Sequence, residues 1–359
     1  MNDQRFEEVR NFIVQNLDEH PADIARLVAD RFNVSRQSAI NYLNKLMAQG
    51  IVTATGNTKA RKYSLRPVLT EFTIDVTADL EEDVIWRQRV LPALHGLKDN
   101  VLGICTYGFT EMLNNVVAHS ESPIALVSVQ YDAAKTQIAI TDAGIGIFNK
   151  IQREFGLDDP RQALLELSKG KLTTDPEHHS GEGIFFTSRI FDDFIILSGR
   201  VFFHRINTKD DQWLLDVKDQ AESAGTSVFL TIRNDSVTTT KDTMDRFASE
   251  EDNFRFSRTH IPIQLAIYEG EQLISRSQAK RILARADRFS EVMLDYQGVT
   301  EIGQAFADEV YRVYQRAHPD VTIVSVNTTA EIRHMMNRAL ANSGEQDASI
   351  QKPSQGVLI

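Results

Sequence analysis

The stretch FTEMLNNVVAHS, residues Phe109 to Ser120, decides the fold assignment of this chain. If it is helical, Glu111, Asn115 and His119 lie four residues apart and share one face. The apolar residues around Leu113 can then anchor the helix to a core. A carboxylate, an amide and an imidazole on one helical face indicate a functional site. Taken alone, the pattern is equally typical of a helix with three satisfied polar residues.

A glycine-containing loop downstream favours the functional interpretation. Ile124 to Gln130 and Thr136 to Thr141 are two β-rich runs around a turn, which predicts a hairpin. The second run ends in DAGIG, which begins at Asp142 and contains Gly144 and Gly146. A carboxylate at a strand end can accept a hydrogen bond from an exocyclic amine. The two glycines allow the backbone to pass close to a ligand.

Two further glycine elements follow in the chain. Gly181-Glu-Gly183 opens a predicted helix, and the free N–H groups at a helix N-terminus suit phosphate. Gly225-Thr226 precedes a predicted strand, residues 227–232. Each element is weak evidence by itself, because turns use glycine everywhere. Four elements in this order, with strands and helices between them, favour one composite site.

Residues 70–235 resemble the GHKL ATPase domain of gyrase, heat-shock chaperones, histidine kinases, MutL and anti-sigma-factor kinases. EMLNN from Glu111 to Asn115 matches the N box of that family, and DAGIG from Asp142 matches its first glycine box. The GEG at 181–183 matches the second glycine box, and the Gly-Thr pair at 225–226 matches the pair that follows it. The resemblance implies an α/β sandwich, with helices on one face of a mixed sheet, that binds ATP and Mg²⁺.

The resemblance also implies a role for each matching residue. Asn115 would ligate Mg²⁺ through its amide oxygen, and Glu111 would orient or deprotonate the attacking water or hydroxyl. Asp142 would hold the adenine amino group. His119 matches a histidine of anti-sigma-type members, but a packing role is equally compatible with its position. The remaining cofactor-binding residues would be those of the glycine elements: Gly144, Gly146, Gly181, Gly183 and Thr226.

The same resemblance assigns residues 148–180 to a lid over the nucleotide. Asp159-Pro160 predicts the start of a helix that runs to about Ser168. The following KGKLTT would be mobile, and Lys171 could then reach a γ-phosphate; an ordinary basic loop is the alternative. The adjacent His178 and His179 lack a third ligand in the sequence, so we expect no metal site there.

Residues 1–66 resemble a winged helix-turn-helix domain. Three helices are predicted, over residues 5–17, 22–32 and 35–47, and a short hairpin follows over residues 51–65. From Arg31 to Arg66 there are seven basic residues and no acidic one, whereas the whole chain has a net charge of −11. A basic segment on an acidic protein suggests a polyanionic partner.

Double-stranded DNA is the expected partner of this domain. In winged helix-turn-helix proteins the third helix enters the major groove, and the wing contacts phosphates or the minor groove. A winged helix used only for protein contacts is the alternative. Helix-turn-helix proteins commonly read two half-sites, so we expect a homodimer. The predicted DNA-binding residues are Arg36, Gln37, Ser38, Asn41 and Lys45 on the third helix, and Lys59, Arg61 and Lys62 on the wing.

The composition is that of an ordinary globular protein, with 42% hydrophobic and 25% charged residues. No apolar run is long enough for a transmembrane helix, and the N-terminus lacks the pattern of a signal peptide. Cys105 is the only cysteine, which excludes an internal disulfide. A cytoplasmic protein without membrane contact is the simplest interpretation.

The C-terminal part resembles the STAS-like family. Residues 236–257 are predicted as a connector and residues 258–341 as a small α/β domain with alternating strands and helices. STAS partners of anti-sigma kinases carry a phosphorylatable serine at the start of a helix, where this chain has Gln304 or Ala305. Thr300 is a nearby hydroxyl, but a turn or capping role is the commoner one for such a threonine. We therefore expect an interaction or dimerisation module that can bind a protein partner, and a disordered tail over 342–359.

Together these features predict a multidomain α/β protein: an ATP-responsive DNA-binding regulator with three domains. The alternative is a serine/threonine protein kinase of the anti-sigma type that acts on a separate partner. A slow ATPase whose turnover resets a complex is a third interpretation. A histidine kinase is least favoured, because no helix pair with an acceptor histidine precedes the ATPase-like region.

Overall fold

The computed structural model describes residues 3–57, 60–172, 180–207, 211–216, 223–249, 255–267 and 271–350. The chain divides into two compact units, and each is described by itself. Unit 1 comprises Met1–Gly144, Phe191–Phe194 and Ser227–Thr239. Unit 2 comprises Ile145–Ile190, Ile195–Thr226 and Thr240–Ile359.

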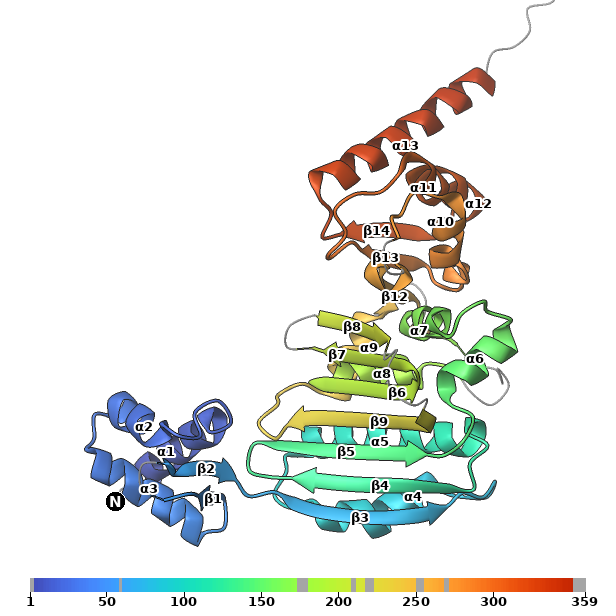
Figure 1. The fold of residues 1–359 in the computed structure, drawn as a ribbon. Coiled ribbons are helices and arrows are strands. Elements are labelled where there is room, and N and C mark those ends of the chain that lie inside the picture. The colour runs from blue at the N-terminus through green and yellow to red at the C-terminus, as the bar shows by residue number, and fades with distance from the viewer. Residues whose placement is uncertain are drawn as a thin grey trace, which may run out of the picture. The chain divides into compact units, whose positions relative to one another are not determined.

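Unit 1 begins with three helices and a two-stranded hairpin, the elements that the sequence predicts (Figure 1). Ser35 caps the third helix, since its side chain accepts a hydrogen bond from the Ser38 N–H. Residues with no exposed surface, such as Ile13, Val28 and Leu43, form a core of their own between the three helices. The elements are α1 (Asp3–Asn16), α2 (Ile24–Phe32), α3 (Arg36–Ala48), and the antiparallel strands β1 (Val52–Thr55) and β2 (Lys62–Leu65).

A seven-stranded sheet follows, with the strand order β3-β4-β5-β9-β6-β7-β8. The sequence patterns predict the β4–β5 hairpin and most of β9, but they do not predict β6, β7 or β8. The predicted Gly225-Thr226 pair lies inside β9 rather than before it. The strands are β3 (Val68–Asp75), β4 (Ile124–Tyr131), β5 (Lys135–Asp142), β6 (Asp193–Gly199), β7 (Val201–Ile206), β8 (Asp211–Asp216) and β9 (Ser223–Arg233).

Within unit 1, helices cover one face of the sheet. α4 (Glu82–Ile85), which continues in a π-helical turn (Trp86–Val90), and α5 (Asp99–His119) lie behind the strands in Figure 1. The strands alternate cleanly, so that one face is buried beneath these helices and the other is open. The buried face carries Phe72, Ile74, Ala125, Val127, Val129, Ile138, Ile140, Val228, Leu230 and Ile232.

α5 begins ten residues before the predicted helix. Gly103 and Gly108 weaken the helical signal in this stretch, because glycine is a poor helix former. Gly108 is nevertheless required, since a Cβ atom there would lie 2.3 Å from the Phe191 ring. Close packing against Phe191 therefore explains a glycine that sequence propensity counts against the helix.

Unit 2 contains the segment predicted as a lid. It forms α6 (Ile147–Phe155) and α7 (Pro160–Lys169), and α8 (Gly183–Ile190) follows it. Residues 173–179, including His178 and His179, lie outside the described residues. The predicted start of α7 is confirmed: Asp159 is its N-cap and accepts a hydrogen bond from the Arg161 N–H at 2.8 Å.

The C-terminal part of unit 2 is a small α/β domain, as predicted. Its sheet has three parallel strands in the order β12-β13-β14: β12 (Arg258–Pro262), β13 (Glu291–Asp295) and β14 (Thr322–Val326). The helices are α10 (Arg276–Leu283), α11 (Gln304–Asp308), α12 (Gln315–Ala317) and α13 (Ala330–Ile350), and a π-helical turn (Glu309–Tyr314) joins α11 to α12. The connector forms α9 (Thr240–Arg246) and the short paired strands β10 (Ala248–Ser249) and β11 (Arg255–Phe256).

Two sequence patterns in this domain suggest other boundaries than the structure has. The β-rich run at 261–268 suggests a strand, but the strand lies earlier, because Pro262 ends β12 and residues 263–266 form a 3-10 turn. α13 continues to Ile350, into the segment predicted as a disordered tail, and residues 351–359 lie outside the described part. The polar composition of 342–350 suggested disorder, but these residues also tolerate a helix that has already been nucleated.

No helix in the described residues is both long enough and apolar enough to cross a membrane.

Candidate functional site

The predicted site helix presents its polar face as expected. Glu111, Asn115 and His119 are half-buried on α5, whereas Met112 and Leu113 are buried. The side-chain nitrogen of Asn115, Nδ2, is buried and has no hydrogen-bond partner among the described residues. An unsatisfied buried amide costs about 1–3 kcal/mol, so its presence in a native protein requires an explanation.

A bound ligand provides such an explanation for Asn115. A carboxamide offers a donor on one side and an acceptor on the other, and the two are interchanged by turning the group over. The group can therefore donate to a phosphate oxygen through Nδ2. Turned over, it can present its oxygen to a hard cation such as Mg²⁺. This donor set fits the ion that the family resemblance implies.

The loop after β5 packs on the C-terminal end of α5. The Asp142 carboxylate is buried, and its Oδ1 accepts a hydrogen bond from the Gly144 N–H at 2.8 Å. The Ser122 hydroxyl accepts another from the Ala143 N–H at 3.2 Å. A Cβ atom at position 144 would lie 1.8 Å from the Ser120 carbonyl oxygen. Gly144 therefore brings Asp142 directly beside the end of the helix that carries Asn115.

Unit 2 brings the second glycine of this loop to the Gly-Thr pair. The Thr226 hydroxyl accepts a hydrogen bond from the Ile147 N–H, the first amide of α6, at 2.9 Å. Gly146 has a φ of 82°, and a Cβ atom there would lie 2.6 Å from the Ser198 hydroxyl. Ser198 in turn donates to the Gly225 carbonyl at 2.9 Å. Sequence analysis did not identify Ser198, because a single serine inside a strand carries no distinguishing pattern.

Gly181 and Gly183 lie at the start of α8. Gly181 has a φ of 71°, and a Cβ atom there would lie 2.5 Å from the backbone of Leu172. Gly183 is the first residue of the helix, so N–H groups of its first turn are available to a ligand. Partial burial raises the pKa of the Glu182 carboxyl between these glycines, and the nearby Lys171 opposes that shift.

The two lysines of the predicted lid contact the C-terminal domain. Lys171 Nζ donates to the Arg288 carbonyl at 2.9 Å, and Arg288 donates back to the Lys171 carbonyl at 3.0 Å. Contact between Lys171 and a γ-phosphate stays a prediction, and it requires Lys171 to leave Arg288.

Lys169 does not belong to a loop, as its sequence context suggested, but ends α7 and is almost completely buried. Its Nζ donates to Glu166 Oε1 at 2.6 Å and to the Ala284 carbonyl at 2.8 Å. The Thr259 hydroxyl donates to the Lys169 carbonyl at 2.6 Å. Burial lowers the pKa of Lys169, and Glu166 opposes that shift. α7 is therefore tied to the C-terminal domain by the hydrogen bonds of Lys169 with Ala284 and Thr259, whereas the ion pair with Glu166 lies within α7.

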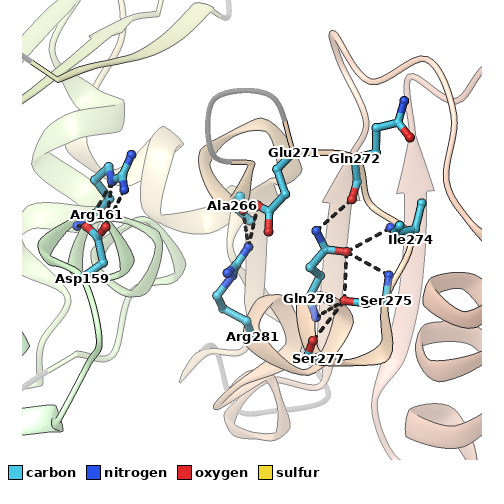
Figure 2. Close-up of polar contacts among 10 residues, drawn as sticks. All are labelled: Asp159, Arg161, Ala266, Glu271, Gln272, Ile274, Ser275, Ser277, Gln278 and Arg281. Atoms are coloured by element: carbon cyan, nitrogen blue, oxygen red, sulfur yellow. Dashed lines mark hydrogen bonds and ion pairs between the residues drawn. The ribbon is translucent and has the colours of Figure 1, made fainter.

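A polar hollow of about 790 Å³ lies between α7 and α10 (Figure 2). On one wall, Gln278 forms a capping box with Ser275 and donates to the Gln272 carbonyl at 2.8 Å. On the same side, Arg281 bridges Glu271 and the Ala266 carbonyl. Gln162 and Glu166 line it from α7.

The predicted DNA-binding residues of α3 lie on its solvent face. Arg36, Gln37, Asn41 and Lys45 are exposed, and Ser38 is half-buried. Gln37 donates to the Asn41 side chain at 3.2 Å, and Lys45 Nζ lies 3.7 Å from the centre of the Phe6 ring.

On the hairpin, Lys62 is exposed and the Arg61 guanidinium lies over the Tyr63 ring at 5.2 Å. Lys59 lies outside the described residues. Among the residues that the structure describes, no three His, Cys, Asp or Glu side chains gather to form a metal site.

The family comparison concerns the C-terminal domain. Residues 278–333 match the family model described as a STAS-like domain of unknown function (DUF4325). This match confirms the predicted STAS-like character of the region from α10 to the first turn of α13. A search of curated proteins found no match to the chain.

Proposed function

We propose that this protein is an ATP-responsive DNA-binding regulator. In this proposal residues 1–66 are a winged helix-turn-helix domain, residues 70–235 are a GHKL-type ATP-binding domain, and the STAS-like domain responds to the state of the lid. The unsatisfied buried amide of Asn115, on the same helical face as Glu111, is the observation that carries the proposal.

The chain's own residues would bind and orient the nucleotide. Asn115 would hold Mg²⁺, which neutralises phosphate charge when bound, and Asp142 would accept a hydrogen bond from the adenine amino group. The hydrogen bond from the Gly144 N–H supports this role for Asp142, because it fixes the carboxylate. The family resemblance adds Gly146, Gly181, Gly183 and Thr226 to the binding residues.

DNA binding rests on the exposed face of α3. Arginine, glutamine and asparagine side chains can form bidentate hydrogen bonds with base edges in the major groove. Arg36, Gln37 and Asn41 occupy the first two turns of α3 and are all exposed. The acid-free composition of residues 31–66 favours the approach of phosphates to this surface.

Contacts between the proposed lid and the STAS-like domain provide a route for the response. Lys169 and Lys171 both donate to carbonyl groups of that domain. A nucleotide that binds two arrangements of the lid with different affinity would shift these contacts. Such a shift would change the packing of the flanking domains and thereby the affinity for DNA.

The test compares DNA affinity with no nucleotide, with ADP, and with a non-hydrolysable ATP analogue. Binding sites are first selected from random double-stranded DNA, and affinity is then measured by fluorescence anisotropy. Asn115→Ala should abolish the nucleotide effect and leave basal DNA binding unchanged. Asn114→Ala is the matched control on the neighbouring position of α5 and should keep the effect. Equal affinity in all three nucleotide states refutes the proposal.

A protein serine/threonine kinase of the anti-sigma type is the second candidate. Glu111 lies one helical turn before Asn115 and could accept a proton from a substrate hydroxyl. Transfer of radiolabelled γ-phosphate to a separate protein, lost in Glu111→Ala, would favour this candidate. Release of inorganic phosphate without protein labelling would indicate a slow ATPase instead.

A further inference from the structure

The open face of the sheet in unit 1 carries exposed apolar side chains. Leu69, Ile124, Leu126 and Phe229 are 54%, 47%, 45% and 41% exposed. Leu126 and Phe229 lie on the face opposite the helices (Figure 1), because their neighbours along the strand are buried, and Ile124 and Leu69 share that face by their alternation and strand register. An antiparallel sheet that faces water on one side normally presents polar residues there. An apolar patch on such a face marks an interaction surface.

The strand register gathers these residues into one surface, which we call the open-face patch. Leu126 pairs with Thr141, which pairs with Ser227. One row further along, Ser128 pairs with Ala139, which pairs with Phe229. On the central strands the patch comprises Ile124, Leu126, Ser128, Gln130, Gln137, Ala139, Thr141, Ser227, Phe229 and Thr231.

The polar members of the patch already satisfy one another. Thr141 donates to the Ser227 hydroxyl at 3.0 Å. Gln130 donates to Gln137 at 3.4 Å, and Gln137 donates to Thr231 at 3.3 Å. Burial of such groups is costly only when it leaves them without partners. The open-face patch can therefore be covered by a flat surface that offers no hydrogen bonds of its own.

The charge distribution identifies the occupant. The ten patch residues on β4, β5 and β9 are all uncharged. The charged side chains on this face of β3, β4, β5 and β9 lie around them: Glu71 and Asp75 on β3, and Lys135 and Arg233 opposite each other at one end of β5 and β9. In a two-fold dimer each residue near the axis meets its own copy, so a charge there would face a like charge. A neutral, internally satisfied patch on a chain with a net charge of −11 meets that requirement. We propose that the open-face patch is the homodimer interface, with a second copy of this chain as its occupant.

The size of the patch indicates the strength of the dimer. Four strands about 4.8 Å apart and seven residues at about 3.3 Å each give a footprint of about 450 Å². Two copies would together bury about 900 Å², less than the roughly 1,200 Å² at which stable interfaces begin, so the dimer should be weak and dissociate on dilution. This inference shares only one element with the proposed function, the expectation of a dimer. If ATP or DNA binding proved absent, the proposed dimer interface would still stand.

Sedimentation velocity over a concentration series tests the interface on the full-length chain. Phe229→Glu and Leu126→Glu place a charge in the patch twice per dimer, and each should weaken dimerisation by roughly 100-fold or more. Val237→Glu is the matched control, because Val237 is 85% exposed outside the patch. A wild-type chain that is monomeric at every concentration overturns the proposal, and so does a dimer that persists in both patch variants.

Cross-linking provides a second measurement that does not depend on a destabilised variant. Cys105 is the only cysteine, is fully buried, and burial raises the pKa of its thiol to about 12, so it should not react. Ser128→Cys and Ala139→Cys therefore introduce a single reactive thiol in the patch. A short bis-maleimide should link at least one of them into a covalent dimer, and Val237→Cys should stay monomeric. Equal cross-linking of all three variants contradicts the assignment.

Discussion

Replacement of Lys169 by methionine tests whether the proposed lid is energetically coupled to the STAS-like domain. Lys169 is 1% exposed, and its ammonium satisfies both Glu166 and the Ala284 carbonyl. Methionine has nearly the same length but no donor. The substitution therefore leaves a buried carboxylate whose closest remaining cation is Arg285, at 4.0 Å. Removal of one partner from a buried ion pair typically costs about 3–5 kcal/mol.

The double variant Glu166→Leu/Lys169→Met separates the ion pair from the packing. It removes the buried charge as well as its partner, so most of the lost stability should return. The Ala284 carbonyl still lacks its donor, which leaves a residual cost of about 1–3 kcal/mol. Lys241→Met is the control for the loss of a lysine, because the Lys241–Asp245 pair is exposed and should contribute nothing measurable.

The assay is equilibrium unfolding in urea, combined with hydrogen exchange of the amides of α7 and α10. Lys169→Met should lower the urea concentration at the unfolding midpoint and accelerate amide exchange in both helices together. The reason is that Lys169 Nζ bonds Glu166 of α7 and the carbonyl groups of Arg281 and Ala284 at the end of α10. A loss below about 1 kcal/mol would refute the reasoning, since the ion pair would then be replaceable at little cost. A double variant as unstable as the single one would also refute it.

Three further predictions follow from the geometry. Gly144→Ala should lower the free energy of unfolding in urea by about 2–4 kcal/mol, because the added Cβ would lie 1.8 Å from the Ser120 carbonyl oxygen. Gly103→Ala is the control: no atom lies within 4 Å of the added Cβ, so it should stabilise α5 by about 0.5–1 kcal/mol. Burial opposes ionisation of Asp295, but hydrogen bonds from His260, Asn327 and Gln297 outweigh it and lower its pKa below 3.8. The stability that this carboxylate contributes is complete above about pH 4 and is lost as the pH falls through the folded-state pKa. Asp295→Asn, unlike Asp320→Asn, should therefore flatten the acid limb of a plot of melting temperature against pH. On the proposed DNA surface, Lys62→Ala should reduce the slope of log affinity against log salt by about one, whereas Asn41→Ala should alter sequence preference at one base position.

Patterns of local chemistry predicted the elements that depend on neighbours in sequence. The cap at Ser35, the proline at the start of α7 and the β4–β5 hairpin were all visible in the sequence, because each is determined within a few residues. The beginning of α5 was missed because Gly108 is selected by Phe191, which is far away in the chain. β6, β7 and β8 were not predicted, although β7 pairs with β8, its neighbour in sequence; of their pairings, only that of β6 with β9 joins strands that are not adjacent in sequence.

The site could be predicted as a list of residues but not as a set of contacts. Asp142, Gly144 and Thr226 were identified from motifs, yet their partners Ser122 and Ser198 carry no motif. The burial of Lys169 was also invisible, since a lysine in a Lys-Gly-Lys run has the pattern of an exposed loop. The position of such a lysine depends on an acceptor, here the Ala284 carbonyl, that is far away in sequence.

The start of α11 bears on how the STAS-like domain would respond to nucleotide under the proposed function. The expected phosphoacceptor position is occupied by Gln304, the first residue of that helix, or by Ala305. Gly303 before it donates to the Leu273 carbonyl at 2.7 Å, and a Cβ atom there would lie 2.7 Å from Ile274 Cα. Gln304 and Ala305 are both exposed, but a position with no hydroxyl cannot accept a phosphoryl group on oxygen as serine does. The buried Lys169 ammonium, in contrast, joins the proposed lid to this domain directly through its hydrogen bond to the Ala284 carbonyl. Coupling through packing therefore accounts for the domain better than phosphorylation within the same chain does.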